Sequence, residues 1–387
     1  MWRHPGSGGD EGGVVTPTVR LYGRVLGYGS HAQVTDGFAG VLRDADLLAG
    51  IVAFDRDLPP DSPQPGGALA PHAVFTGPLG HLRAMRSGAR HRARYAMLAP
   101  NSSAVPPLLL RALESECTEI LVPSEWAQEV VEELTSIPVR VVPHGIAPGF
   151  VRSPSLREVA AEAYRRGAFN VLHLSSSDRE RKGTHALLEA WGMLMAKGEL
   201  PAEAKLRLVL DVEALSKTVA WMAERAGPGM RLDSVTVTAR LEARPTALAQ
   251  VYGVQHVVCQ PSRGEGFGCC PLEGLACGVP IVATACTGHS QWFRPLSLQP
   301  SLPGAVRVEH GPDARIDDLP GAMAPTVEPD AVAVALRRAY AEWEALDAAA
   351  ASGAAALRET WAWGRQIAPF VEYLRQSDAN QQETTTP

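Results

Sequence analysis

Short apolar runs rich in β-branched residues alternate with longer segments of helical periodicity along most of the chain, and this alternation limits the possible folds more than any other feature. A run, a helix and a second run form a βαβ unit, whose strands pair in parallel. The rhythm is repeated in both halves of the sequence, so we predict an α/β fold with two parallel sheets. The predicted strands are residues 19–22, 50–54, 72–75, 94–98, 119–122 and 139–142, then 170–174, 205–210, 234–238, 256–260, 279–283 and 305–308.

A segment without strand character separates the two halves. Residues 143–169 open with Pro and Gly breakers, which favours a domain junction there, and two sheets joined by a hinge leave a cleft. The polar C-terminal residues are typical of a disordered tail. The predicted organisation is an N-terminal domain at 14–148, a hinge at 149–168, a second domain at 169–345, a C-terminal helix packing across both domains at 346–376 and a disordered tail at 377–387.

The charge and cysteine content of the chain indicate its cellular compartment and disfavour some classes of partner. A net charge of −6 argues against a chain held to nucleic acid by its overall field. The six cysteines include no C-x-x-C pair and are clustered, which suits neither a disulfide framework nor a zinc site. No apolar run approaches the roughly 18 residues that a membrane span needs. We expect a cytoplasmic protein, peripheral to a membrane at most.

The strongest local signal is a glycine-rich loop between a strand and a helix. The segment HVVCQPSRGEGFGCCPLEGLACG covers residues 256–278, and its loop reads SRGEGFG. In an open α/β sheet such a loop offers backbone N–H groups and a helix N-terminus to a phosphate. Glu265 and Glu273 would repel phosphate, so they suit hydroxyl groups instead. Phosphate and hydroxyls together indicate a nucleotide sugar. The alternative is that Glu265 is a solvated loop residue and that Glu273 is a charge near a helix N-terminus, favoured by the helix dipole.

Basic residues follow a second strand at the same edge of the predicted sheet. The turn DRERKG lies between the strand NVLHL and a helix from Thr184, and it carries Arg179, Arg181 and Lys182. Arg and Lys beside a helix N-terminus provide the donors and the positive charge that a diphosphate needs, whereas the alternative is a solvated turn. The segment TACTGHSQW at 284–292 follows a further strand at that edge.

Taken together, these segments resemble a known enzyme family. PSRGEGFGCCPLEGLACGVPIVATACTG is similar to the Glu-x7-Glu segment of retaining GT-B glycosyltransferases, in particular glycosyltransferase family 4, and LVPSEWAQEVV, VRVVPHGI and RKGTHALLEAW are further matches. The resemblance implies two Rossmann-like domains facing across a cleft, with C-terminal helices crossing back to the first domain. It implies a retaining, hexosyltransferase-type enzyme that moves a sugar from a nucleoside-diphosphate sugar to a hydroxyl acceptor on a glycan, lipid or small molecule, with no metal and no cofactor.

The resemblance also assigns roles to individual residues. Glu265 and Lys182 would be catalytic, Glu265 facing the sugar hydroxyls and Lys182 neutralising the diphosphate. Glu273 would bind the ribose. The remaining implied donor contacts are Arg179, Arg181, Gly264, Gly266, Phe267 and Gly268, and the implied N-terminal cleft residues are Gly27, Gly29, Ser30, Asn101 and His144.

Several positions depart from the family pattern. Ser177 stands where an arginine is usual, Gln291 where many members have an acid, and Asn101 where a His or Glu is common. These departures leave open a catalytically inactive nucleotide-sugar binding protein, and a related GT-B epimerase or phosphorylase is a further alternative. A competing motif, Asp55-Arg56-Asp57, resembles the metal-holding Asp-x-Asp of GT-A enzymes, but the two-domain layout disfavours it.

One stretch of the N-terminal half is strongly basic. Residues 81–95 contain no acid and include Arg83, Arg86, Arg90, Arg92 and Arg94. Either they form a solvated helix face, or they bind an anionic partner such as membrane headgroups or the phosphates of a nucleic acid carrying a modified base as acceptor.

Overall fold

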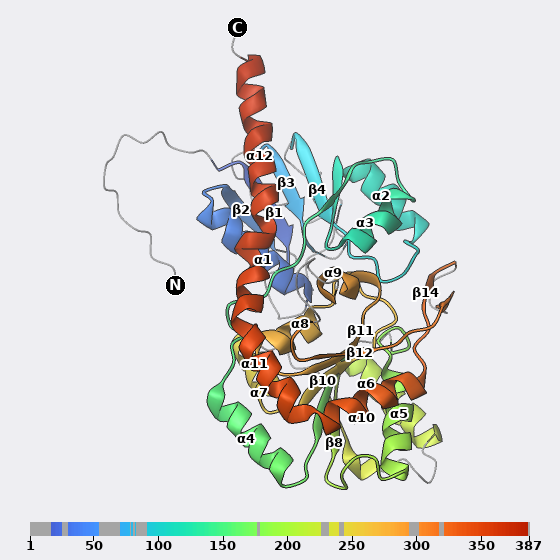
Figure 1. Cartoon of the computed structure of the whole chain (residues 1–387). Coiled ribbons are helices and arrows are strands. Elements are labelled where there is room, and N and C mark those ends of the chain that lie inside the picture. Colours follow the sequence, from blue (N-terminus) through green and yellow to red (C-terminus); the bar gives the residue numbers. More distant parts are fainter. Residues whose placement is uncertain are drawn as a thin grey trace.

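The computed structural model contains two parallel sheets, each flanked by helices, as the sequence predicts (Figure 1). This confirms the predicted GT-B arrangement of two Rossmann-like domains. The structure describes residues 17–24, 30–53, 70–77, 79, 82, 91–175, 179–225, 232–239, 244–293, 302–316 and 321–385.

The N-terminal sheet has the strand order β2-β1-β3-β4-β5-β6, and all its neighbours are parallel. Its strands are mostly apolar because helices cover both faces. The bounds are β1 Val19–Gly23, β2 Leu48–Ala53, β3 His72–Phe75, β4 Ala93–Met97, β5 Glu119–Val122 and β6 Val139–Val141. The helices of this half are α1 Ser30–Asp44, α2 Pro107–Glu116 and α3 Glu125–Glu132.

The second sheet has the order β12-β11-β10-β7-β8-β9, again entirely parallel. Its strands are β7 Asn170–Ser175, β8 Lys205–Leu210, β9 Val235–Ala239, β10 Val257–Gln260, β11 Ile281–Thr284 and β12 Ala305–Val308. Its helices are α4 Pro154–Arg165, α5 Thr184–Ala196, α6 Val212–Arg225, α7 Pro245–Gly253, α8 Cys269–Ala276 and α9 Ser290–Phe293, with 3-10 turns at Leu232–Ser234 and Thr287–His289. A separate antiparallel hairpin joins β13 Asp313–Arg315 to β14 Met323–Pro325.

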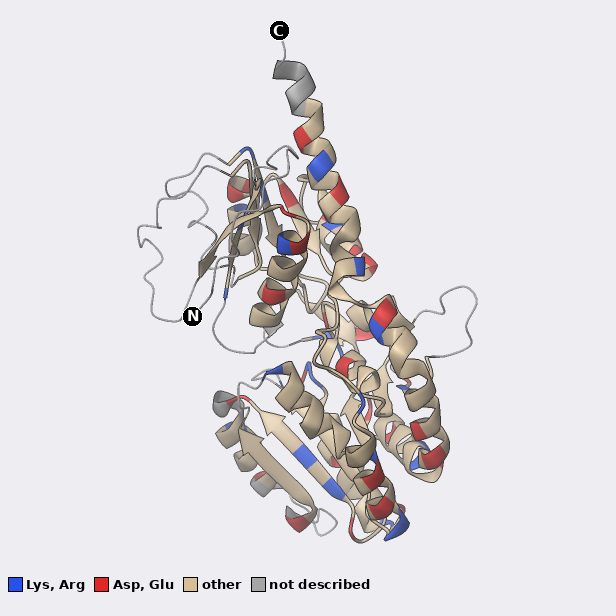
Figure 2. Cartoon of the chain, turned by 90° about the vertical axis from the view of Figure 1, so that its left-hand side faces the viewer, with Lys and Arg blue, Asp and Glu red and all other residues tan. Residues whose placement is uncertain are grey.

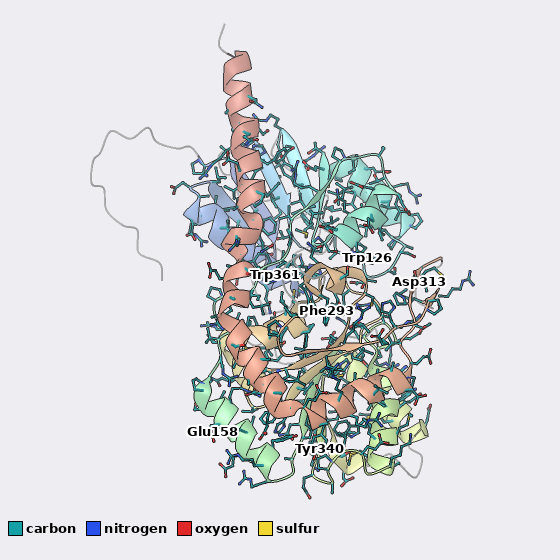
Figure 3. The ribbon with its side chains drawn as sticks, in the orientation of Figure 1. Trp126, Glu158, Phe293, Asp313, Tyr340 and Trp361 are labelled. Carbon is teal, nitrogen blue, oxygen red and sulfur yellow. The ribbon has the colours of Figure 1, made fainter. Side chains whose placement is uncertain are left out.

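Three C-terminal helices complete the fold. They are α10 Pro329–Ala341, α11 Trp343–Thr360 and α12 Trp363–Thr385. The chain crosses back to the N-terminal domain between α11 and α12, where Ile146 N–H donates to the Trp361 carbonyl at 2.7 Å. Gly145 is required at this crossing, because a Cβ there would lie 2.5 Å from the Trp363 Cα. Trp361 marks the crossing in Figure 3.

Helix α12 forms part of the core of the N-terminal domain. Trp363, Ile367 and Phe370 are buried in one cluster with Phe38 and Leu42 of α1. Acidic and basic residues occur along the length of this helix (Figure 2). Among the described residues, no helix combines the length and apolar character that crossing a bilayer requires.

The predicted disordered tail is wrong for most of its length, since α12 continues to Thr385. Asp378 explains part of this extension. Its Oδ1 accepts from Arg92 at 2.7 Å and lies 3.0 Å from Nε2 of the buried His72. The partner of Asp378 in this ion pair lies almost 290 positions earlier, so local composition cannot reveal it. The composition of residues 377–387 alone therefore predicted disorder.

The two domains contact each other directly beside the glycine-rich loop. Ser124 is the N-cap of α3, accepting from Ala127 N–H at 3.2 Å. Its hydroxyl also donates to the Gly266 carbonyl at 2.9 Å. The neighbouring Glu125 N–H donates to Gln291 Oε1 at 3.0 Å, so Gln291 caps α3 from the other domain. Trp126 and Phe293 lie near this boundary in Figure 3.

Candidate functional site

The candidate site lies where the strand order of the second sheet reverses. Strands β7 and β10 are paired neighbours, yet β7 leads to α5 on one side and β10 to α8 on the other. A crevice opens at such a switch point, outside the carboxyl ends of the strands. The turn containing Lys182 follows β7 and the loop containing Glu265 follows β10, so the topology alone brings these two segments together.

Both helices that leave the switch point begin with a glycine in the left-handed conformation. Gly183 precedes α5 with φ 70° and Gly268 precedes α8 with φ 87°, and neither helix has a side-chain cap. A side chain would also be excluded sterically, because a Cβ on Gly183 would lie 2.0 Å from the Pro261 carbonyl oxygen and one on Gly268 1.9 Å from the His289 ring. The uncapped first-turn N–H groups are suited to an anionic ligand.

Glu265 is the centre of the polar contacts at this site. Lys182 Nζ donates to Glu265 Oε1 at 2.6 Å, and Arg181 NH1 lies 3.5 Å from Oε2. The Ser262 hydroxyl donates to Oε1 at 2.8 Å. Arg181 also donates to the Gly264 carbonyl at 2.6 Å, which ties the basic turn to the glycine-rich loop.

Glu265 is ionised in this setting although it is buried. Burial on its own would raise the pKa of the carboxyl, but Lys182, Arg181 and His289 outweigh it and lower the pKa from 4.5 to about 2. The group is therefore a fixed hydrogen-bond acceptor at any physiological pH, consistent with holding hydroxyl groups and not with acid catalysis.

The turn after β11 supports the loop from behind. Glu265 N–H donates to Thr287 Oγ1 at 3.0 Å, and Gly288 N–H donates to the Glu265 carbonyl at 2.8 Å. Thr287 itself has φ 49°, a left-handed conformation that β-branched residues rarely adopt. Trp292 Nε1–H donates to the Phe267 carbonyl at 2.8 Å. Backbone strain held in place by such contacts is typical of functional sites.

A cavity of about 610 Å³ extends from these residues to the N-terminal domain. Its second-domain lining includes Arg181, Lys182, Glu265 and residues 266–270, and its first-domain lining includes Asn101 and His144. Burial lowers the pKa of His144 to about 3, so its ring is neutral, and its Nδ1 lies 3.8 Å from Cys269 Sγ. Residues from the carboxyl edges of both sheets thus share one cavity.

Three of the residues implied as donor contacts, Arg179, Gly264 and Glu273, lie outside the cavity lining. Glu273 is buried deeper in α8, where Tyr252 Oη–H donates to its Oε2 at 2.9 Å. Arg179 also does not line the cavity, and its NH1 is buried. Gly264 approaches Asn101 so closely that a Cβ would lie 1.9 Å from the Asn101 carbonyl oxygen.

Some sequence-predicted positions cannot be placed. Gly27, Gly29, Ser177 and the Asp55-Arg56-Asp57 motif lie outside the described residues, and of Ser30 the structure describes only its place at the start of α1. His31, next to it, lines the cavity.

Of the basic stretch at 81–95, the structure describes Leu82 and residues 91–95. Arg83, Arg86 and Arg90 lie outside the described residues. Arg92 binds Asp378 and immediately precedes β4, at the sheet edge opposite the cavity. Arg92 therefore fastens α12 to the N-terminal sheet and does not extend toward the cavity.

Sequence reasoning did not anticipate the β13–β14 hairpin or the residue that holds it. Arg263 follows β10, and its side chain donates to the carbonyls of Pro325 at 2.9 Å and Arg315 at 3.2 Å and pairs with Glu180. The hairpin also reaches the first domain, where Ser103 N–H donates to the Met323 carbonyl at 3.1 Å. Asp313 marks the hairpin in Figure 3. The only available signal was Arg263 itself, within the glycine-rich motif.

We expect Arg263→Ala to lower the free energy of unfolding by about 2–4 kcal/mol, because it removes a buried charged donor from several hairpin carbonyls. Urea denaturation provides the measurement. Arg338→Ala is a matched control, since Arg338 forms an exposed pair with Glu342 and should cost no more than about 0.5 kcal/mol. Equal losses in the two variants would contradict the role given to Arg263.

A comparison with protein families identifies the family of the chain. Residues 122–370, more than half of the chain, match a family described as "Family 4 Glycosyltransferase in conflict systems". The chain belongs to this family. Among relatives of this glycosyltransferase, a "D-inositol 3-phosphate glycosyltransferase" from Mycobacterium avium is 31% identical over 169 residues, covering 41% of the chain and 38% of the relative. One of the same name from Kribbella flavida is 36% identical over 93 residues, covering 24% of the chain and 20% of the relative. The matches thus span well under half of these relatives' length.

Solved structures confirm the fold of the glycosyltransferase over nearly its whole length. Sucrose-phosphate synthase from Thermosynechococcus elongatus superposes with a TM-score of 0.64 at 15% identity, over 94% of the chain and 100% of that structure. HepE from Anabaena, in complex with UDP and glucose, gives a TM-score of 0.65 at 13% identity, over 93% of the chain and 100% of HepE.

Proposed function

We propose that this family 4 glycosyltransferase is a retaining, metal-independent enzyme that transfers a hexose from a nucleoside-diphosphate sugar to a hydroxyl acceptor. The observation that carries the proposal is the pairing of Lys182 and Arg181 with Glu265 at the switch point. Two cations beside two uncapped helix N-termini suit a diphosphate, and a fixed carboxylate next to them suits sugar hydroxyls. HepE, a structural neighbour, was solved with UDP and glucose, which supports UDP as the first nucleotide to test.

Each residue has a defined part in the proposed reaction. When the donor's anomeric C–O bond breaks, negative charge builds on the departing diphosphate, where Lys182, Arg181 and the N-terminus of α8 stabilise it. Glu265 orients the sugar through its hydroxyls. We give no donor contact to Glu273, because it lies further along α8, outside the cavity lining, and accepts from Tyr252.

The geometry favours transfer on a single face of the sugar over a double displacement. Double displacement needs a free carboxylate nucleophile beside the anomeric carbon. Glu265 is the one carboxylate among the described lining residues, and Lys182, Arg181 and Ser262 already engage it. In the proposed reaction the leaving phosphate accepts the proton of the acceptor hydroxyl, so the enzyme supplies position and charge.

A thermal-shift screen with UDP-, GDP- and ADP-sugars tests the donor class. A cognate ligand at 100 times its Kd adds about 2.7 kcal/mol to stability, a readily measured shift in Tm. We expect one nucleotide series to stabilise the wild type and to lose its effect in Lys182→Ala. Release of nucleoside diphosphate with an acceptor present then separates an enzyme from an inactive binding protein, for which binding would occur without turnover. No stabilisation by any series would contradict the proposal.

A further inference from the structure

We propose that the acceptor is a neutral molecule of small-molecule size that carries its hydroxyl on an aromatic or alkyl framework. The inference rests on the proposed function and concerns the end of the cavity away from Lys182. Side chains of the first domain and the hairpin form the walls there, and the six that carry the argument are Val34, Met97, Leu98, Val105, Leu109 and Ile316.

These apolar walls are held by the cores behind them. Val34 and Met97 belong to the cluster beneath α1, and Leu98 and Val105 belong to the cluster beneath α2. Ile316 is packed against the hairpin residues Ala322 and Ala324. An apolar surface this well supported does not rearrange to accept polar groups, so polyol hydroxyls that face these six side chains would have no hydrogen-bond partner there.

The distribution of charge leads to the same conclusion. Among the described lining residues, the first domain contributes no Lys, Arg, Asp or Glu, and the charged side chains are Arg181, Lys182 and Glu265 at the donor end. Arg181 and Lys182 already pair with Glu265 and are assigned to the diphosphate. A phosphate on the acceptor would therefore find no cation among the described residues at the apolar end.

The size of the space limits the acceptor. The whole cavity measures about 610 Å³, within the roughly 300–1,000 Å³ range of small-molecule sites, and the acceptor shares it with the donor sugar. It is continuous with the residues assigned to the sugar, so a molecule at the apolar end has its hydroxyl close to the anomeric carbon. The hairpin completes this wall with Ile316, and Arg263 holds the hairpin in place.

Binding of three matched probes tests the inference by isothermal titration calorimetry. The probes are 4-nitrophenyl glucoside, glucose and glucose 6-phosphate, each titrated with and without UDP. Because the nitrophenyl ring buries apolar area against the walls, we expect its glucoside to bind at least about tenfold more tightly than either other probe. Glucose 6-phosphate binding as tightly as the nitrophenyl glucoside would overturn the inference.

Two adjacent leucines of α2 provide a matched pair of variants. Leu109 lines the cavity, whereas Leu108 is 76% exposed to solvent. Leu109→Gln is expected to weaken nitrophenyl glucoside binding at least about fivefold with the Kd of UDP unchanged, and Leu108→Gln to alter neither.

Ile316→Asn, on a different element, is a second variant should Leu109→Gln unfold, as judged by circular dichroism. If the lining variants bind the nitrophenyl glucoside like Leu108→Gln, the apolar acceptor is refuted. Failure of UDP to bind would instead count against the proposed function. The probe titrations without UDP test the acceptor separately, because they do not depend on nucleotide binding.

Discussion

Replacing Lys182 with alanine is expected to reduce sugar transfer at least about a hundredfold, the loss seen when one fixed donor to a developing charge is removed. Lys182 combines a 2.6 Å bond to Glu265 with a place in the cavity lining. Without it, the departing diphosphate keeps only Arg181 and the helix N-termini. Measuring kcat and the Kd of the nucleotide in parallel shows whether the loss falls on the chemical step, on binding or on both.

Two further variants separate charge from structure. Lys182→Arg restores the positive charge with a different geometry, so partial recovery is expected. Lys197→Ala, at the exposed end of the same helix α5, should leave turnover unchanged. Wild-type turnover by Lys182→Ala, in a preparation free of other glycosyltransferases, would remove Lys182 from the mechanism.

Glu265→Gln is expected to destabilise the protein by an amount that depends on pH. The folded-state pKa of Glu265 is about 2 against an ordinary 4.5. A lowered carboxyl pKa contributes stability that is fully present above the unfolded value and is lost as the pH falls toward the folded value. At about 1.4 kcal/mol per pKa unit, this contribution is about 3 kcal/mol at pH 6, and about 2 kcal/mol of it is lost by pH 3.

Urea unfolding of wild type and Glu265→Gln at pH 6 and pH 3 measures this difference. The gap between the two proteins should narrow by about 2 kcal/mol at the lower pH. Glu158→Gln controls for general effects of acid, because Glu158 points outward from α4 and forms an exposed pair with Arg165 (Figure 3). Its gap from wild type should stay within about 0.5 kcal/mol at both pH values. A constant gap for Glu265→Gln would mean that the carboxylate is not held by its cationic neighbours.

The periodicity of the sequence predicted the sheets well because parallel strands covered on both faces are continuous apolar runs. The strands at 72–75, 119–122, 205–210 and 305–308 coincide with the predicted bounds. Connection rules allow few strand orders for such a sheet, and the loops after its strands meet at one edge. The placement of Lys182 and Glu265 at the same sheet edge was therefore predictable. Their direct ion pair was not, because it depends on side-chain placement.

The β13–β14 hairpin was missed because its sequence, DARIDDLPGAMAP, shows neither clear alternation nor a standard two-residue turn. It exists through contacts made elsewhere, chiefly those of Arg263 with its carbonyls. Tertiary contacts also decide the surroundings of Glu273. The Glu-x7-Glu spacing locates this residue on α8, but the orientation of the helix places its side chain beside Tyr252 and away from the cavity.

The return of α12 to the first domain has a consequence for synthesis on the ribosome. Trp363, Ile367, Phe370 and Leu374 fill the core of a domain whose first strand begins at Val19. That core is incomplete until more than 340 further residues have been translated and have left the exit tunnel. The cores on the two faces of the second sheet draw on residues up to Trp361, so they can be completed before α12 has been translated. The domain translated first is thus the later one to reach its native packing, and the nascent chain must keep its apolar strands from aggregating until then.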